Sequence, residues 1–122
     1  MFHTSIPKIL RLSLAAAVVI GVVLALRPAP IARAATISVN TTTDELNSDG
    51  DCSLREAIRA ANLDQTVDAC PAGNGADTIN LPDGNYSLSI AGTAENAALT
   101  GDLDITEDLT LDGAGRANTT IV

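Results

Sequence analysis

Carboxylate and amide side chains recur at alternate positions in the polar segment that ends at Asp51. Glu45, Asn47 and Asp49 fall at positions one, three and five of a loop whose sixth residue is Gly50. Glu56 then stands at position twelve. This spacing approximates a calcium-binding loop, in which oxygen ligands surround the ion and glycine forms the sharp turn. It predicts a weak calcium site with the candidate ligands Glu45, Asn47, Asp49, Asp51 and Glu56.

The same segment has a simpler interpretation, because it departs from the calcium-loop pattern. Position one is Glu45 rather than an aspartate, no amphipathic helix precedes the loop, and Glu56 also matches a helix cap. An Asn/Asp/Gly turn that leads into a helix explains the composition equally well. Both interpretations stay open at this point.

A second group of acidic residues lies near the C-terminal end of the sequence: Asp102, Asp104, Glu107, Asp108 and Asp112. Two carboxylates that face each other across a sugar hydrolyse glycosides. A lyase also needs a base, and Arg116 is the only basic residue nearby. Asp104 alternates outward between Leu103 and Ile105, and the other acids fall in turns. We therefore favour a solvated acidic edge and predict no catalytic residue.

The only two cysteines are Cys52 and Cys70. An even number of cysteines in an exported chain favours a disulfide, and a bond across 18 residues would contribute about 3 kcal/mol. The alternative is a catalytic thiol at Cys52, activated by the following helix N-terminus. The only histidine, His3, lies in the expected leader, so no Cys–His pair is available.

The positions around Cys52 predict a short amphipathic helix over residues 53–62. Ser53 and Glu56 have the spacing of a capping box, in which each side chain accepts a hydrogen bond from the backbone of the other. One apolar stripe carries Leu54, Ala57, Ile58 and Ala61. Such a helix must pack its stripe on another element.

Residues 1–34 read as a secretory signal peptide. Basic Lys8 and Arg11 precede an uncharged run over 12–26, and Ala32-Arg33-Ala34 has the form of a cleavage site. The uncharged run covers about 22 Å, less than the roughly 30 Å of a bilayer core, so a membrane anchor is only the alternative. We expect a secreted or cell-surface protein that meets a membrane only through an uncleaved leader.

Removal of the leader would leave three basic and 15 acidic residues, a net charge of −12. This charge argues against nucleic acid and anionic membrane surfaces as partners. It suits an acidic extracellular surface, with calcium as a possible cofactor and an extracellular polysaccharide or a cell-surface ligand as a possible partner.

Short alternating segments predict a mainly β fold, the N-terminal portion of a right-handed parallel β-helix with a capping helix. Ile79 and Leu81 recur as Leu103 and Ile105, 24 residues later, and Tyr86 and Leu88 recur as Leu109 and Leu111, 23 residues later. A small antiparallel sandwich is the alternative. The expected inward residues are Ile79, Leu81, Tyr86, Leu88, Ile90, Leu103, Ile105, Leu109, Leu111 and Ile121.

Three regions follow from this pattern. A signal peptide over 1–34 precedes an N-terminal cap over 35–76, which holds a strand at 35–40, the helix and the disulfide loop. Residues 77–122 would form the first coils. The last residues lie inside an expected strand, so we interpret the sequence as truncated there.

The segment Cys52-Ser53-Leu54-Arg55-Glu56-Ala57 resembles the signature of the CSLREA domain, an N-terminal module of bacterial secreted β-helix proteins. Further similar segments are 37–44, 58–62, 69–73, 76–79 and 101–105, so the resemblance covers about residues 36–122. It implies a pectate-lyase-like coil and a secreted or surface protein, sometimes with a C-terminal anchor. The family has no established catalytic residues in this module.

The sequence thus favours a non-catalytic secreted or cell-surface cap module that serves adhesion or surface display. The alternative is the N-terminal part of a polysaccharide lyase or glycoside hydrolase. A third possibility is a structural cap stabilised by calcium. We expect that the chain is not itself an enzyme, with the lyase or hydrolase as the alternative.

Overall fold

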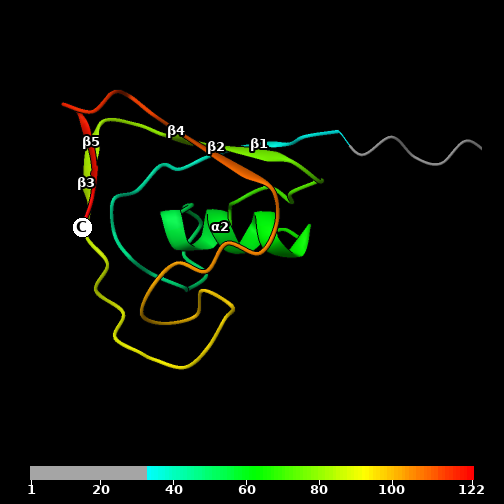
Figure 1. Cartoon of the computed structure of the whole chain (residues 1–122), viewed down its shortest axis with the longest axis horizontal. Helices are drawn as coiled ribbons and strands as arrows, with labels where there is room; N and C mark the ends of the chain where they lie inside the picture. Colours follow the sequence, from blue (N-terminus) through cyan, green and yellow to red (C-terminus); the bar gives the residue numbers. More distant parts are fainter. Residues whose placement is uncertain (1–32) are drawn as a thin grey trace, which may run out of the picture. The chain divides into compact units, whose positions relative to one another are not determined.

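The computed structural model describes residues 33–122, which form one helix and five short strands (Figure 1). The elements are β1 (Thr36–Ser38), α2 (Leu54–Leu63), β2 (Asp77–Leu81), β3 (Gly84–Tyr86), β4 (Leu109–Gly113) and β5 (Thr119–Ile121). Nearly all of the predicted signal peptide lies outside the described residues. Within residues 33–122, no helix has the length and apolar character needed to cross a membrane.

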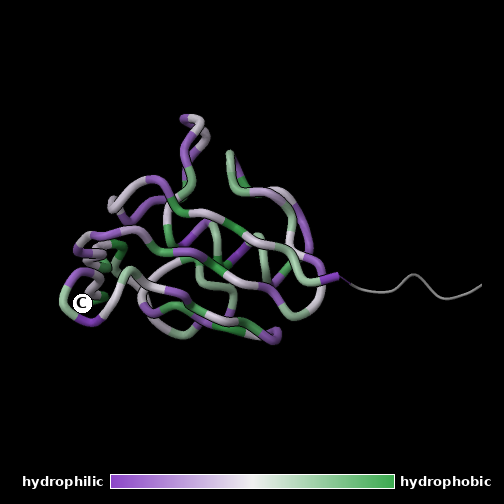
Figure 2. Tube along the Cα trace, turned by 90° about the horizontal axis from the view of Figure 1, so that it is seen from above, coloured by the Kyte–Doolittle hydropathy of each residue, from purple (hydrophilic) through white to green (hydrophobic). Residues whose placement is uncertain are grey.

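The strands form two parallel sheets, one with the order β1-β2-β4 and one that pairs β3 with β5. Alternation of apolar and polar residues directs one face of β2 inward, so Ile79 and Leu81 are buried. Ile37 of β1 lies beside Ile79 in the first sheet, and Tyr86 of β3 lies beside Ile121 in the second. Hydrophobic and hydrophilic residues accordingly interchange over short distances along the trace (Figure 2).

Helix α2 packs its apolar face on β1 and β2 (Figure 1). Ser53 is its N-cap: its side chain accepts from the backbone N–H of Glu56, and the Glu56 side chain accepts from the backbone N–H of Ser53. The helix ends at Leu63, and its C-cap Asp64 adopts a left-handed conformation with φ of 50°. Leu54, Ala57, Ile58 and Ala61 are all buried.

The loop that follows the helix packs closely against the backbone of the helix at Gly73. The N–H of Gly73 donates to the carbonyl of Ala60 at 3.1 Å. A Cβ at position 73 would lie 2.7 Å from the Cα of Ala61, so no residue larger than glycine fits without a shift of the backbone.

The prediction of a right-handed parallel β-helix is wrong for the described residues. They form two small parallel sheets of three and two strands, and neither sheet is closed or extended into a solenoid. The predicted repeat also has the wrong length: Ile79 pairs with Leu111, 32 residues later, and Tyr86 pairs with Ile121, 35 residues later. Residues 87–108 lie between these strands and form none of their own.

Part of the expected inward set is therefore not in the core. Ile79, Leu81 and Tyr86 are buried, and Leu103 and Leu109 pack against the core from partly buried positions. Leu88 and Ile90 are also only half-buried, and Ile105, Leu111 and Ile121 are exposed. Leu103-Asp104-Ile105 forms no strand because the backbone groups of Asp102, Asp104 and Thr106 bond to side chains of the helix instead of to a sheet.

Candidate functional site

Four carboxylate side chains and one more from a distant loop gather beside the N-terminus of α2. Carboxylate oxygens of Glu45, Asp49 and Asp51 all lie within 4.8 Å of one another, and so do those of Asp51, Glu56 and Asp68. Asp51 belongs to both groups. We call these five residues the acidic cluster. Oxygen atoms at this spacing are the ligand type that Ca²⁺ prefers.

The structure uses two of the predicted ligands in other ways. The side-chain amide of Asn47 donates to Glu45 at 2.8 Å and to Asp49 at 3.1 Å, so its nitrogen faces the carboxylates. Glu56 accepts from the backbone N–H of Asn47 at 3.1 Å and from that of Ser53 at 3.0 Å. Both oxygens of Glu56 thus serve the turn and the helix cap, as the alternative interpretation of this segment requires.

Sequence reasoning missed Asp68 as a member of the cluster. Its carboxylate accepts from the backbone N–H groups of Asp49 at 3.2 Å and Gly50 at 2.8 Å. The signal for it was indirect: a bond between Cys52 and Cys70 must bring residue 68 close to residues 49–51. The structure confirms this disulfide, with a Cα–Cα distance of 4.9 Å.

Mutual repulsion makes the acidic cluster electrostatically unfavourable at neutral pH. Desolvation raises the pKa of Glu45, and the charges of Asp51 and Asp49 raise it further. Desolvation and the Asp49 carboxylate likewise raise the pKa of Asp51. One oxygen of Asp51, Oδ1, is shielded from solvent and has no hydrogen-bond partner among the described residues. A divalent cation would relieve both conditions, so calcium binding stays a prediction for this cluster.

We predict that the chain binds Ca²⁺ with a dissociation constant on the order of 0.1–1 mM, the range of extracellular calcium modules. At tenfold excess over this constant, linkage should stabilise the fold by about 1.4 kcal/mol. Calorimetric titration and the thermal midpoint measure the two effects. Asp51→Asn should abolish them, because Asp51 belongs to both carboxylate groups. Asp83→Asn, an exposed aspartate outside the cluster, is the matched control. Heat that persists unchanged in Asp51→Asn would contradict the prediction.

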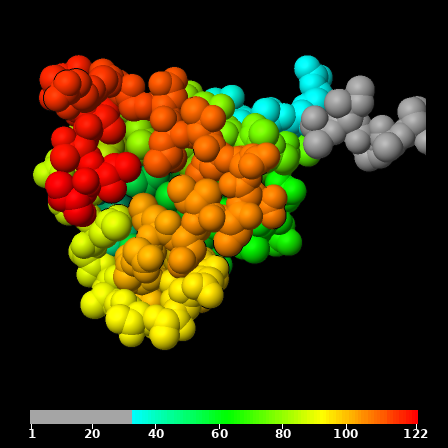
Figure 3. Space-filling view, in the orientation of Figure 1, coloured from blue at the N-terminus to red at the C-terminus, as the bar shows by residue number. Residues whose placement is uncertain are grey.

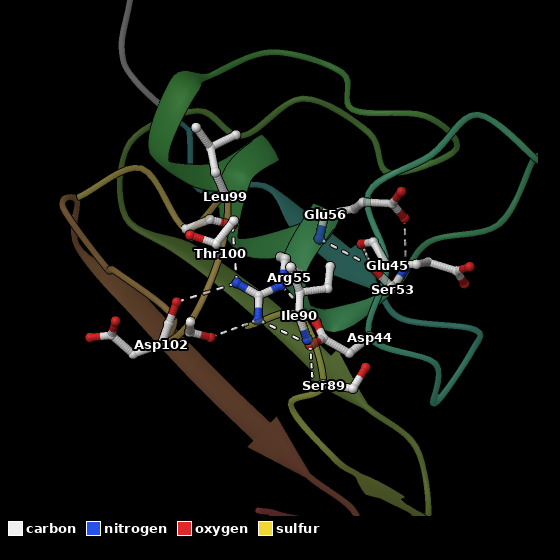
Figure 4. A network of polar contacts seen from close by, with 12 residues as sticks. Asp44, Glu45, Ser53, Arg55, Glu56, Ser89, Ile90, Leu99, Thr100 and Asp102 are labelled. Atoms are coloured by element: carbon white, nitrogen blue, oxygen red, sulfur yellow. Dashed lines mark hydrogen bonds and ion pairs between the residues drawn. The ribbon is translucent and has the colours of Figure 1, made fainter. Parts of the chain in front are cut away.

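A buried arginine forms a second polar site on the same helix (Figure 4). Arg55 is fully buried, and its Nε and Nη2 donate to the two carboxylate oxygens of Asp44 at 2.6 and 3.1 Å. Its Nη1 and Nη2 also donate to the backbone carbonyls of Ala98, Gly101 and Asp102 at 2.9–3.3 Å. The guanidinium thereby joins three segments of the chain.

Asp44 connects this arginine to a further stretch of backbone. Its Oδ2 accepts from the N–H groups of Ser89 at 2.6 Å and Ile90 at 2.9 Å (Figure 4). Burial by itself raises the pKa of Asp44, but the hydrogen bonds from Arg55, Ile90 and Ser89 outweigh it and hold this pKa below its ordinary value. Asp44 is therefore ionised at neutral pH.

The other acidic residues considered as catalytic candidates lie mostly on the exposed surface. Asp102, Glu107, Asp108 and Asp112 are exposed, and Asp104 is half-buried with its carboxylate accepting from the N–H of Ala98. Arg116 is exposed. Among residues 33–122, these five acids supply no group of three facing carboxylates. A shallow pocket of about 620 Å³ lies beside the Arg55 site; Leu88–Thr93, Gly101 and Asp102 line it.

Comparison with known proteins gave no match: no family model, no curated protein and no solved structure is similar to this chain. The resemblance to the CSLREA domain therefore rests on the residues of this sequence alone.

Proposed function

We propose that the chain is a non-catalytic structural module of a secreted or cell-surface protein, of the CSLREA type, that serves adhesion or surface display. The observation that supports this is the burial of all six residues of the Cys52–Ala57 segment. A catalytic or ligand-binding motif must present its polar groups to a ligand. Here the polar groups of the motif bind other parts of the same chain.

Each residue of the segment has an internal role. Cys52 forms the disulfide, Leu54 and Ala57 pack in the core, and Ser53 and Glu56 cap the helix. Arg55 holds the backbone of residues 98–102 and, through Asp44, that of residues 89–90. The motif thus connects residues 87–108, the long segment between β3 and β4, to the helix. This is a structural role.

The export part of the proposal is supported by the disulfide and by the charge. Disulfides persist in oxidising compartments outside the cytosol. The excess of acidic over basic residues, 15 to 7 in the whole sequence, suits a solvated extracellular surface. An extracellular polysaccharide or a cell-surface ligand is the partner class that we propose for such a module.

Export and chemistry are tested together in a bacterial host that produces the full chain. We expect cleavage after Ala34, an exported product and no free thiol on alkylation; a variant that lacks residues 2–34 should stay in the cytosol with two reactive thiols. The purified product should release no unsaturated or reducing ends from polysaccharides above a blank. An uncleaved cytosolic chain would refute the export proposal, and measurable turnover would refute the non-catalytic one.

A further inference from the structure

Asn74-Gly75 is the only place in the sequence where a glycine follows an asparagine. The backbone nitrogen after an asparagine can attack the side-chain carbon Cγ, because the attack closes a five-membered ring within the chain. The nitrogen of a glycine reaches this carbon most easily, since glycine has no Cβ to obstruct it. This pair is therefore where the sequence offers the least hindrance to the reaction.

The fold leaves both reacting groups of this pair accessible. Asn74 is exposed, and neither residue belongs to a helix or strand. The backbone N–H of Asn74 donates to both carboxylate oxygens of Asp77 at 3.0 and 3.1 Å, whereas its side-chain amide makes no hydrogen bond among residues 33–122. The N–H of Gly75 donates to the Asp64 carboxylate at 3.3 Å, not to a carbonyl of a helix or sheet. Figure 3 shows the green atoms of this part of the chain at the surface, near the cyan start of the described residues.

Asn96-Ala97 provides a comparison within the same chain. Asn96 is exposed and lies outside the helix and the strands, as Asn74 does. The N–H of Ala97 donates to the carboxylate of Glu95 at 2.7 Å, so this nitrogen also faces an acidic side chain. The main difference is the Cβ of the alanine, which hinders ring closure. Asn96 should therefore react more slowly than Asn74.

The surroundings of Asn74 would not accommodate the product without a change in the loop. The carboxylate of Asp77 is buried and also accepts from the N–H of Ala35 at 2.8 Å, so it connects residue 74 to the start of the chain before β1. A carboxylate at position 74 would repel Asp77 and Asp64, which accept from the N–H groups of residues 74 and 75. The preceding residue, Gly73, has no space for even one added carbon atom.

We propose that Asn74 is a site of spontaneous deamidation, and that its product loosens the loop of residues 73–77 from Asp64 and Asp77. The Gly75 nitrogen bonds to Cγ of Asn74, the Cγ–Nδ2 bond breaks, and Nδ2 leaves as ammonia with the proton of the attacking nitrogen. Water then opens the ring. Attack of water at Cγ gives aspartate, and attack at the backbone carbonyl carbon gives isoaspartate, whose main chain runs through Cγ.

Water is the only co-reactant in these steps, and nothing is oxidised or reduced. The isoaspartate product lengthens the main chain by one carbon atom beside Gly73, and both products add a negative charge. The inference goes beyond the proposed structural role, because it assigns a chemical modification site to the module.

Mass spectrometry of peptides from the aged chain tests the reaction. The purified chain is kept in mildly alkaline buffer, sampled over time and digested. We expect the peptide with Asn74 to gain the mass that exchange of an amide NH₂ for OH gives, and to do so about tenfold faster than the peptide with Asn96. An unchanged Asn74 peptide, or equal rates at the two asparagines, would overturn the proposal.

Two variants show that the pair itself determines the rate. Asn74→Gln should abolish the mass gain at this position, because its ring would need six atoms, and Gly75→Ala should slow the gain about tenfold. Asn96→Gln is the matched control, since it makes the same change at an exposed asparagine without a following glycine. A Gly75→Ala chain that is folded and reacts as fast as the parent would contradict the proposal.

Thermal unfolding tests the effect on the loop. The aged parent should unfold at a lower temperature than the fresh parent, and aged Asn74→Gln should keep the midpoint of its fresh sample. Fresh Asn74→Asp carries the added charge without the longer main chain, so its midpoint should lie between those of the fresh and aged parent. An unchanged midpoint in a parent sample that is fully modified at residue 74 would overturn the loosening of the loop.

Discussion

Arg55→Met is expected to lower the free energy of unfolding by about 3–5 kcal/mol, the largest effect of any single substitution considered. The change removes the only positive charge among residues 33–122 that contacts the Asp44 carboxylate, and it leaves the carbonyls of Ala98, Gly101 and Asp102 without this donor. Breaking a buried ion pair by removing one partner costs this much because the other charge stays buried. Denaturant unfolding followed by circular dichroism measures the loss.

Two further variants separate the charge from the packing. Arg116→Met makes the same substitution at an exposed arginine and should change the free energy of unfolding by less than about 0.5 kcal/mol. Arg55→Lys keeps the charge but not the planar fork of donors, so its stability should lie between those of the parent and Arg55→Met. An Arg55→Met chain as stable as the Arg116→Met control would contradict this account of the site.

The pH dependence of stability gives an independent view of the same pair. The folded pKa of Asp44 is lower than that of the unfolded chain, so its contribution is present above the ordinary aspartate value of about 4 and is lost as the pH falls through the folded value. Asp44→Asn should therefore reduce the loss of stability below pH 4. The pKa of Glu95 is also lowered, by a hydrogen bond from the N–H of Thr100. The loss of stability that comes from protonating Glu95 should therefore remain in the Asp44→Asn variant.

The local patterns of the sequence predicted local structure well. The capping spacing of Ser53 and Glu56 agrees with a helix that begins at Leu54, and the two cysteines form the expected bond. Alternation at residues 78–81 and 109–111 agrees with β2 and β4. These signals depend on neighbours within a few residues, so the sequence contains them directly.

The error in the repeat came from contacts between distant residues. Leu103-Asp104-Ile105 alternates like a strand, but Asn62 donates to the carbonyl of Asp104 at 2.7 Å and accepts from the N–H of Thr106 at 3.0 Å. These bonds span more than 40 residues and use the backbone groups that a sheet would need. Nothing in the alternation itself could reveal them.

Arg55 shows the same limit for the candidate site. A helical projection places it off the apolar stripe, where a solvated side chain is expected. It is buried because the segment between β3 and β4 folds over it and offers three carbonyl oxygens. Residues 91–101 within that segment are rich in alanine, glycine and threonine, and this composition carries no signature of an arginine-binding surface.

Replacing both cysteines by alanine is the second large expected effect, a loss of about 3 kcal/mol in the free energy of unfolding. The bond between Cys52 and Cys70 closes 18 residues, and a cross-link of this length restricts the unfolded chain by about that amount. The variant should unfold at lower denaturant concentration with a steeper dependence, because its unfolded state exposes more surface. Urea unfolding of the oxidised parent and the double variant gives both quantities.

The double variant also tests how the acidic cluster is assembled. Asp68 reaches the backbone of Asp49 and Gly50 from the loop that the disulfide holds in place, with Cys70 two residues away. Without the bond, the entropy of that loop opposes the contact, so calcium binding should weaken more than in Asp83→Asn. Stability equal to that of the parent in urea would contradict this prediction and would show that other contacts of the loop, rather than the covalent bond, hold it in place.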